Sequence, residues 1–347
     1  MKTMERLLLH HLRPQVRHAL DPLQFAYQEK VGAEDTIIYM LHRSLSHLDR
    51  GSGAVRIMFL DFSSTFNTIQ PLLLRDKLIE MGVDSYLVAW IVDYLTDRSQ
   101  YVCLGNCRSD IVVSNTGAPQ GTVLSPVLFS LYTSDFQYNS ESCHVQKFTD
   151  DTAIVACIRS GQEEEYRNLI KDFVKWCDSN HRQLNTSKTK ELVVDFRRTR
   201  PLMDPVIIRG DCVQRVQTYK YLGVQLDDKL DWTANTDALC KRGQSRLYFL
   251  RRLASFNICK MLQMFYQTVV TSALFYAVVC WGGSIKKRDA SRLDKLVRKA
   301  GSIVGMELDS LTSMAERRAL SRLLSIMENP LHLLNRIISR QRSSFSD

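Results

Sequence analysis

The chain has 347 residues, of which 45% are hydrophobic and 24% are charged, so it can bury a substantial core and general disorder is excluded. Its nine cysteines are odd in number, and no two of them form a CxxC pair. This pattern argues against a disulfide framework and against a zinc knuckle, and it favours a reducing compartment.

Positive charge is concentrated at the carboxyl-terminal end. Residues 241–347 carry 19 Lys and Arg against 7 Asp and Glu, whereas residues 1–240 carry 27 against 30. A basic module behind a slightly acidic front is typical of a protein that holds a polyanion with one part while another part does chemistry. A solvated helical surface without a ligand explains the same charge equally well.

The first half of the chain reads as a mixture of strands and helices. We expect a buried strand over 55–62, a helix from Pro71 to the stop at Gly82, and a second helix that Asp84 caps and that runs to about residue 97. Further on, the pattern predicts a hairpin over 100–105 and 110–115, a Gly- and Pro-rich loop over 117–126, and a helix over 127–136.

The later elements change from strands to helices. Strands are expected over 144–148 and 152–157, with a turn between them, and an amphipathic helix over 162–180. Strands over 190–196, 206–210 and 218–226 follow, and the pattern is helical from about Trp232 onward, as over 236–256 and 258–281. The fold class is therefore α+β in front and helical behind.

One uncharged run, 261–285, is long enough to cross a membrane. Gln263 and Gln267 lie on one face of the expected helix, and Gly282 and Gly283 end the run. These residues favour a buried helix of a globular domain, so we expect no membrane partner.

Three aspartates carry the candidate chemistry. Asp61 ends the first expected strand, and Asp150 and Asp151 lie at a hairpin turn that neighbouring central strands would bring close to it. Clustered carboxylates repel one another unless a hard cation offsets their charge, and oxygen ligands select Mg²⁺ or Mn²⁺. Two such ions, about 3.5–4 Å apart, promote in-line phosphoryl transfer. Asp151 joins the site only if the turn rotates it inward, and an Asp-Asp pair alone is usually a turn signal.

The segments FLDFSSTFNTI, TGAPQGTVLSP, KFTDDTAIV, LNTSKTKELVVDF and YKYLGV resemble, in order and spacing, the palm motifs of reverse transcriptases. The upstream segment LQFAYQ and the helical tail resemble non-LTR retrotransposons of the jockey and chicken-repeat types. This resemblance implies a right-hand polymerase fold. Its parts would be partial fingers over 1–54, a palm of antiparallel sheet and helices with inserted fingers elements over 55–226, and a basic helical thumb and carboxyl-terminal region over 227–347.

The resemblance also implies an activity, RNA-directed DNA polymerase, in which two metal ions support nucleotidyl transfer from deoxynucleoside triphosphates (dNTPs) to a primer 3′-hydroxyl. The metals would be Mg²⁺, with Mn²⁺ as a substitute. The partners would be an RNA template, a DNA primer or target DNA, and dNTPs. The sequence gives no indication of the oligomeric state.

Individual roles follow from the same resemblance. Asp61, Asp150, Asp151 and the backbone carbonyl of Phe62 would hold the metals. Phe66 would lie under the incoming sugar and exclude a 2′-hydroxyl, and Gln120 would lie against the nucleotide, beside glycines that let the backbone approach a ligand. A core role for Phe66 and an ordinary loop around Gln120 are the alternatives.

Two further sites are implied downstream. Lys188 would lie near the departing pyrophosphate, with Lys190 as a rival, and could neutralise charge or supply a proton. Tyr221, Leu222 and Gly223 would form the tight strand turn that grips the primer end. The basic helices after residue 232 would hold the template and primer duplex through its backbone.

The chain departs from the family pattern at several positions. Phe148 and Thr149 stand where Tyr-Ala is usual, Thr65 is unusual in its motif, and Gln28 stands where Arg is common. The family's fingers segment and endonuclease domain lie upstream of the matched region. The chain is therefore expected to be an amino-terminally truncated piece with reduced or absent polymerase activity.

Two other functions remain open from the sequence. A non-catalytic nucleic-acid-binding remnant would keep the basic thumb without turnover, and a two-metal nuclease would share the carboxylates but leave Phe66 and Gln120 unexplained. The expected location is intracellular, in the nucleus, the cytoplasm or both. The short basic run Lys286, Lys287 and Arg288 is only a weak nuclear signal.

Overall fold

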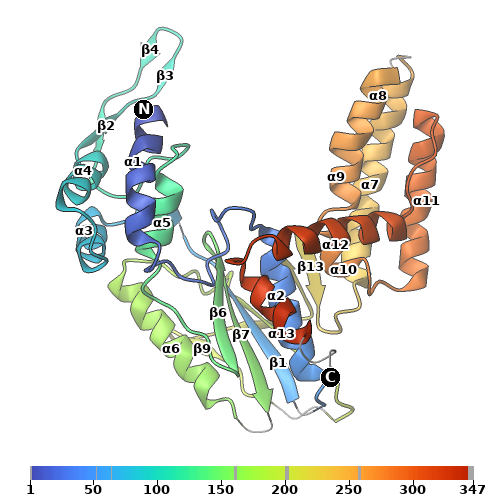
Figure 1. The fold of residues 1–347 in the computed structure, drawn as a ribbon, viewed down its shortest axis with the longest axis horizontal. Helices are drawn as coiled ribbons and strands as arrows, with labels where there is room; N and C mark the ends of the chain where they lie inside the picture. The colour runs from blue at the N-terminus through green and yellow to red at the C-terminus, as the bar shows by residue number, and fades with distance from the viewer. Residues whose placement is uncertain are drawn as a thin grey trace. The chain divides into compact units, whose positions relative to one another are not determined.

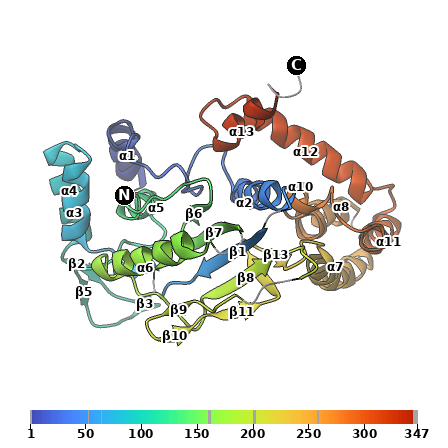
Figure 2. The same ribbon diagram turned by 90° about the horizontal axis from the view of Figure 1, so that it is seen from below.

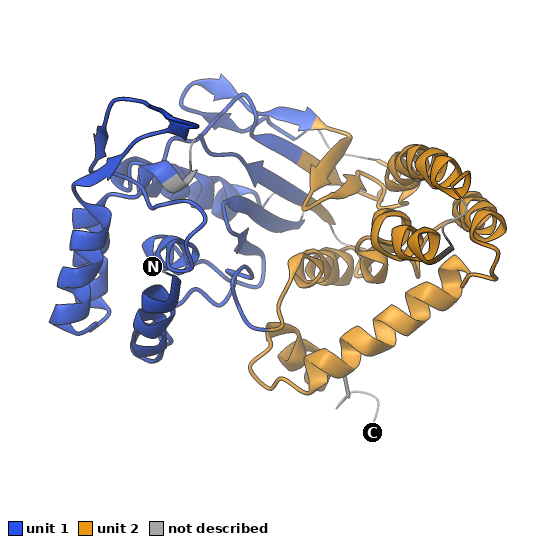
Figure 3. Cartoon of the chain, turned by 90° about the horizontal axis from the view of Figure 1, so that it is seen from above, with its two compact units in different colours: residues 1–29, 56–191, 201–215 blue, residues 30–55, 192–200, 216–347 orange. Residues whose placement is uncertain are grey.

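The structure is a computed structural model that describes residues 2–51, 53–63, 65–159, 162–199, 203–256 and 259–342, with backbone alone at 65, 66, 259 and 340–342. It contains two compact units (Figure 3). Unit 1 comprises residues 1–29, 56–191 and 201–215, and unit 2 comprises residues 30–55, 192–200 and 216–347. This division follows spatial contacts; the fingers, palm and thumb ranges stay a prediction.

Most residues of a five-stranded sheet belong to unit 1 (Figure 2). Its strand order is β11-β8-β1-β7-β6, formed by Gln214–Val216, Lys190–Val194, Gly53–Leu60, Asp151–Arg159 and Cys143–Phe148. Every residue of β1 is buried, as the apolar run predicts for a central strand. Strands β6 and β7 form an antiparallel hairpin whose last pair is Phe148 with Asp151. The expected hairpin is thus confirmed, with Asp151 as the first residue of β7 instead of a turn residue.

Helix α6 (Glu164–Ser179) packs beside the sheet, as the two views of the ribbon show (Figures 1 and 2). Its buried residues Tyr166, Leu169, Ile170 and Phe173 recur at helical spacing and join one apolar core with residues of β1, β6 and β7. The amphipathic helix expected over 162–180 is therefore confirmed, and its apolar face supports the strands that carry the aspartates.

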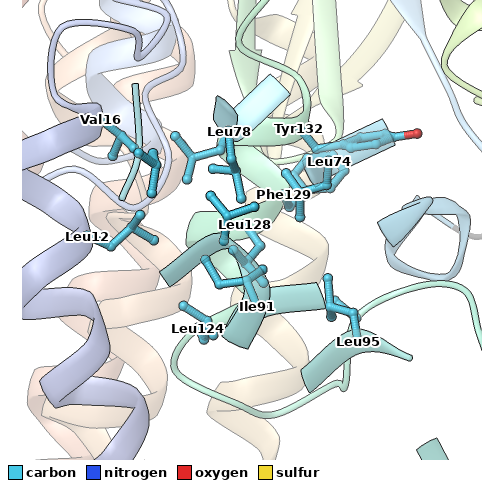
Figure 4. Packing of buried hydrophobic residues seen from close by; sticks show 14 of the residues in the cluster. Leu12, Val16, Leu74, Leu78, Ile91, Leu95, Leu124, Leu128, Phe129 and Tyr132 are labelled. Atoms are coloured by element: carbon cyan, nitrogen blue, oxygen red, sulfur yellow. The ribbon is translucent and has the colours of Figure 1, made fainter. Parts of the chain in front are cut away.

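A second core in unit 1 lies among four helices: α1 (Lys2–Val16), α3 (Pro71–Glu80), α4 (Ser85–Leu95) and α5 (Ser125–Tyr132) (Figure 4). Asp84 caps α4 as predicted, because its carboxylate accepts hydrogen bonds from the backbone of Tyr86 and Leu87. Helix α1 was not anticipated. Its buried Glu5 accepts hydrogen bonds from the backbone nitrogens of Val123 and Leu124 at the start of α5.

Short strands complete unit 1. The hairpin expected over 100–115 is present as two pairs, β2 (Arg98–Gln100) with β5 (Val112–Ser114) and β3 (Cys103–Leu104) with β4 (Cys107–Arg108). The strand expected over 206–210 is shorter, β9 (Ile207–Ile208), and pairs with β10 (Asp211–Cys212). It ends early because Arg209 and Gly210 both have positive φ and form the turn.

Unit 2 contains a hairpin and a set of helices. The hairpin is β12 (Thr218–Tyr221) with β13 (Val224–Asp227), so the segment expected as one strand over 218–226 turns back on itself. The helices are α2 (Ala33–Leu48), α7 (Thr233–Ala254), α11 (Lys287–Val304), α12 (Leu311–Met327) and α13 (Leu333–Arg342), together with the shorter α8 to α10.

The apolar segment of unit 2 is helical but interrupted. It consists of α8 (Cys259–Phe265), a π-helical turn (Tyr266–Val270), α9 (Thr271–Leu274) and α10 (Val278–Trp281), and Ala277 has a φ of 49°. Over Lys260–Trp281 the helical run is long and apolar enough to cross a membrane by length and composition, and 39% of its most apolar stretch is buried inside the protein. The segment is thus only partly enclosed, which differs from the buried helix expected.

The residues after 301, which match no motif, are tied into unit 2 by a buried ion pair. Asp35 of α2 is fully buried and accepts hydrogen bonds from both Nε and Nη2 of Arg322 in α12. His332 is also buried, with Nε2 3.6 Å from Asp35. Removing Arg322 would take its charged hydrogen-bond partner from the buried Asp35 carboxylate, so α12 contributes to the stability of this unit.

Candidate active site

The first candidate ligand, Asp61, follows β1 and is fixed by the chain around residue 184. Asn185 donates a backbone hydrogen bond to the Asp61 carbonyl at 2.9 Å, and Ser63 donates one to the Gln183 carbonyl at 3.0 Å. Between them, Phe62 forms an isolated antiparallel bridge with Leu184. This short pairing continues the backbone hydrogen bonding beyond the end of β1 and holds the backbone of residues 61–63 in place.

The Asp61 carboxylate is only partly neutralised. Its Oδ2 atom is buried and has no hydrogen-bond partner, and the nearest cation is Lys188, whose Nζ lies 3.8 Å away. An unpaired buried carboxylate oxygen is costly unless a cation offsets its charge. Of the two rival lysines, Lys188 is the one beside Asp61, because the ammonium of Lys190 donates to the Ser187 carbonyl at 2.5 Å.

The other two carboxylates lie at the β6–β7 turn. The pKa of Asp151 is raised to about 6, first because its carboxyl is partly desolvated, then because of the negative charges of Asp150 and Asp61. The Asp151 residue as a whole is exposed, so solvent screens part of this effect. The Asp61 charge acts on Asp151 because β1, which Asp61 follows, and β7, which Asp151 begins, are neighbouring strands of the sheet.

The donor chemistry fits a hard divalent cation, although the ligands are not arranged as a closed set. Within the described residues, no group of three or more His, Cys, Asp or Glu side chains is close enough to hold a metal ion. Two observations nevertheless fit a cation here, the unpartnered Oδ2 of Asp61 and the repulsion that raises the pKa of Asp151. Oxygen ligands of this kind suit Mg²⁺ or Mn²⁺.

A buried arginine near the site was not found from the sequence. Arg182 is 3% exposed, and its guanidinium lies over the rings of Phe62 and Phe129, 4.0 and 4.9 Å from their centroids. Its Nε and Nη1 atoms are buried without hydrogen-bond partners. Burial lowers its pKa to about 10, with the charges of Cys177 and Asp150 opposing that effect. Nothing in the local sequence HRQLN signals this position.

Arg182 also borders a cavity of about 380 Å³. The lining residues come from the end of η1 (Thr65–Thr68) and just after it, from the end of α6 and the segment that follows it, and from the β9–β10 turn; they are Asn67, Thr68, Gln70, Cys177, Asp178, His181, Arg182, Gln183 and Arg209. The unpartnered nitrogens of Arg182 are themselves inaccessible, so the cavity does not expose them to a ligand.

The residues implied in nucleotide binding are only partly described. The backbone of Phe66 belongs to η1, and its side chain lies outside the described part of the chain. Gln120 is exposed in a loop between Gly117 and Gly121, whose φ values are 75° and 78°. A Cβ at Gly121 would meet no atom within 4 Å, so the backbone there is open to a ligand.

In unit 2, the triplet Tyr221, Leu222 and Gly223 forms the tight turn predicted for it. Leu222 and Gly223 have φ values of 45° and 87°, and Tyr221 pairs with Val224. The Tyr276 hydroxyl donates to the Leu222 carbonyl at 2.9 Å, and a Cβ at Gly223 would come within 2.8 Å of the Tyr276 ring. Glycine is therefore required at this turn both by conformation and by space.

The basic residues expected in the thumb lie on α7, outside its buried face. Four of them are exposed and one is half-buried; they are Lys241, Arg246, Arg251, Arg252 and Arg242. On the buried face, Gly243 lets the helix approach Leu274 closely, because a Cβ there would come within 2.6 Å of that side chain.

Comparison with known proteins defines the class. The fold is similar to apo telomerase from Candida tropicalis, with a TM-score of 0.50 at 11% sequence identity, covering 98% of this chain and 61% of that one. Together with the family match below, this similarity makes the fold that of right-hand polymerases. The family model described as "Reverse transcriptase (RNA-dependent DNA polymerase)" matches residues 1–226, so the chain belongs to the reverse transcriptase family.

The similar curated proteins are retroelement polymerases. The RNA-directed DNA polymerase from mobile element jockey of Drosophila melanogaster is 26% identical over 85% of this chain and 33% of its own length. The probable RNA-directed DNA polymerase from transposon BS of the same organism is 23% identical over 100% of this chain and 38% of its own. The chain thus spans about a third of these relatives. Residues 232–272 also match a model described as "Alkylated DNA repair protein alkB homolog 8, N-terminal".

Proposed function

We propose that this chain carries the polymerase centre of a non-LTR retrotransposon reverse transcriptase, which extends a primer 3′-hydroxyl with dNTPs on an RNA template. The observation that carries the proposal is the state of the three aspartates. The buried Oδ2 of Asp61 has no hydrogen-bond partner, and Asp150 and Asp151 repel each other. Such an arrangement is unfavourable in a purely structural role, and a divalent cation would relieve it.

In this proposal Asp61, Asp150, Asp151 and the Phe62 carbonyl hold two Mg²⁺ ions, or Mn²⁺ in their place. When bound, such ions polarise the phosphoryl oxygens and stabilise the developing charge. The remaining work belongs to the protein. Lys188, which lies beside Asp61 and is largely exposed, is placed to donate a proton or to offset charge on the departing pyrophosphate.

Nucleotide and primer selection are assigned to other residues. Phe66 would exclude a 2′-hydroxyl by its ring, and Gln120 would contact the nucleotide from a loop with an open backbone. The Tyr221–Gly223 turn would hold the primer end. The exposed basic face of α7 would contact the phosphates of the template and primer, which predicts binding that weakens steeply with salt.

The basic face of α7 also supports a second candidate function, a nucleic-acid-binding remnant without turnover. This alternative predicts salt-dependent binding of an RNA–DNA duplex with no dependence on Mg²⁺ and no effect of Asp150→Asn. We further propose a nuclear or cytoplasmic location, which imaging of a tagged chain in cells tests directly.

Primer extension on an RNA template with Mg²⁺ and dNTPs tests the leading proposal. The assay compares this chain, its Asp150→Asn variant and a version extended upstream, because the chain covers about a third of its relatives and reduced activity is expected from the short form. Extension by the unmodified sequence at either length, abolished by Asp150→Asn, supports the polymerase. Duplex binding without extension at either length supports the remnant instead.

A further inference from the structure

The segment Asp21–Gln28 lies along the outer strand of the sheet in unit 1. Lys147 of β6 donates a backbone hydrogen bond to the Leu23 carbonyl at 2.8 Å, and Phe25 donates one to the Lys147 carbonyl at 2.9 Å. The buried ammonium of Lys147 also lies 2.7 Å from the carboxylate of Asp21. These contacts form a parallel bridge between Gln24 and Lys147, so the segment is held against the strand that leads into the aspartate turn.

The side chain of Gln24 reaches the first residue of that turn with both ends of its amide. Its Oε1 accepts a hydrogen bond from the backbone nitrogen of Thr149 at 3.1 Å, and its Nε2 donates to the Thr149 carbonyl at 3.2 Å. Gln24 is 3% exposed, and Oε1 also accepts from the Ala26 nitrogen at 3.2 Å. The amide is therefore fixed on its own segment and satisfies both backbone groups of Thr149.

Thr149 needs such support because its backbone is strained. Its φ is 60°, a region in which a β-branched residue is a genuine outlier. Residues in such regions persist only where their surroundings over-determine them. Tyr27 makes a further contact with the side chain of Thr149 from the same segment. The turn thus has a defined shape because the Asp21–Gln28 segment imposes it.

We infer that Gln24 is a positioning residue, whose amide fixes the backbone of Thr149 and thereby orients the carboxylates of Asp150 and Asp151. The inference rests on the proposed function, in which the carboxylates of Asp150 and Asp151 bind metal ions. Asp150 follows Thr149 directly, so a rotation of the Thr149 peptide carries the next side chain with it. Partners that orient metal ligands in this indirect way change metal affinity when they are removed.

The test variant is Gln24→Met, which keeps the length of the side chain and removes both hydrogen bonds to Thr149. The matched control is Gln146→Met. Gln146 is a fully buried glutamine on the same strand β6, and its Oε1 lies 3.1 Å from Nε2 of His144. Both variants remove a buried amide from the same region, and only one of them removes the contacts with the turn.

The first measurement is the Mn²⁺ dissociation constant of the purified chain. The electron paramagnetic resonance signal of free Mn²⁺ monitors the titration. We expect Gln24→Met to weaken binding by about tenfold or more, in the range found for partners of metal ligands, and Gln146→Met to change it less than about twofold. Hydrogen exchange of the peptide that contains Thr149 gives a second readout, in which only Gln24→Met should accelerate exchange.

Equal Mn²⁺ affinity and equal exchange in the two variants would overturn the inference while leaving the metal site intact. A separate result would overturn the proposed function, and this inference with it. That result is a chain that binds Mn²⁺ no better than its Asp150→Asn variant.

Discussion

The charged side chains at the two ends of strand β1 differ in how completely they are hydrogen-bonded. Near its start, Arg56 is fully buried and donates to both oxygens of Glu191, at 2.8 and 3.1 Å. Glu191 also accepts hydrogen bonds from Tyr166 and Arg215, each at 2.8 Å. Just after its end, the Oδ2 of Asp61 has no hydrogen-bond partner. One strand therefore connects a charge cluster whose hydrogen bonds are satisfied with a carboxylate that has only a long ion pair, 3.8 Å, to Lys188.

The pKa directions reflect this contrast. Burial raises the pKa of Glu191, but hydrogen bonds from Arg56, Arg215 and Tyr166 outweigh it, so the pKa lies below its ordinary value. At the other end, desolvation and the charges of Asp150 and Asp61 raise the pKa of Asp151 to about 6. The partners of Glu191 are all groups of the protein, which fits a structural role. Carboxylates that repel each other are candidates for a functional site, and this contrast supports the proposed metal site.

The largest expected effect is a loss of polymerase activity when an aspartate near the carboxyl-terminal end of β1 is replaced. Asp150→Asn removes a charge of the proposed metal site, and a loss of about 4 kcal/mol of transition-state stabilisation corresponds to roughly a thousandfold lower rate. Thermal stability of the metal-free chain should change little, because relief of the repulsion with Asp151 offsets the lost attraction to Arg182. Primer extension and thermal unfolding measure the two quantities. A large loss of stability would mean that Asp150 is a structural residue instead.

The next effect is a loss of folding stability when the ion pair near the amino-terminal end of β1 is broken. Glu191→Gln leaves the buried guanidinium of Arg56 without its main partner, although Glu163 remains 2.6 Å from it. Breaking a buried ion pair in this way costs about 3–5 kcal/mol of unfolding free energy. Asp76→Asn, which removes the exposed pair with Arg75, should cost less than about 1 kcal/mol. Urea unfolding of both variants measures the two losses of unfolding free energy. Equal losses would contradict a structural role for the buried Arg56–Glu191 pair.

A smaller effect of opposite sign concerns Arg182, whose buried Nε and Nη1 atoms have no hydrogen-bond partner. Arg182→Met should raise the unfolding free energy by about 1–3 kcal/mol, because it removes two buried nitrogens that have no hydrogen-bond partner. The stacking on Phe62 and Phe129 offsets part of that gain. Urea unfolding measures it, with Arg209→Met as an exposed control. A destabilised variant would show that the guanidinium has partners in solution.

The smallest effect is a pH dependence. The pKa of Asp151 is raised from 3.8 to about 6, so in this range the folded state binds more protons than the unfolded state. The contribution of Asp151 to the stability of the metal-free chain should therefore fall as pH rises from about 4 to about 6. Mn²⁺ affinity should rise over the same range, since the metal needs the carboxylate. Asp151→Asn should flatten both profiles; an unchanged profile would exclude Asp151 as their cause.

Local patterns predicted much of the site. The apolar run before Asp61, the hairpin around the aspartates and the cap at Asp84 follow from hydrophobic spacing and turn chemistry over a few residues, and each is confirmed. These features depend on neighbours in the sequence, which a single chain displays directly.

The remaining features depend on contacts between distant segments. Gln24 meets Thr149 across 125 positions, and Glu5 meets Val123 across 118, so local sequence patterns predict neither contact. Arg182 sits between two aromatic rings that the sequence does not place together. The helix expected over 258–281 is broken at Ala277 without a Gly or Pro within it, because tertiary packing overrides its helical pattern.

The most direct test of the contrast between the two ends of β1 is the Mn²⁺ dependence of thermal unfolding in three chains: wild type, Asp150→Asn and Glu191→Gln. Ligand that binds only the folded state raises its stability. We predict that Mn²⁺ raises the unfolding temperature of wild type and of the less stable Glu191→Gln, and leaves Asp150→Asn unchanged. An equal rise in Asp150→Asn, or its absence in Glu191→Gln, would contradict the assignment of one end to metal and the other to structure.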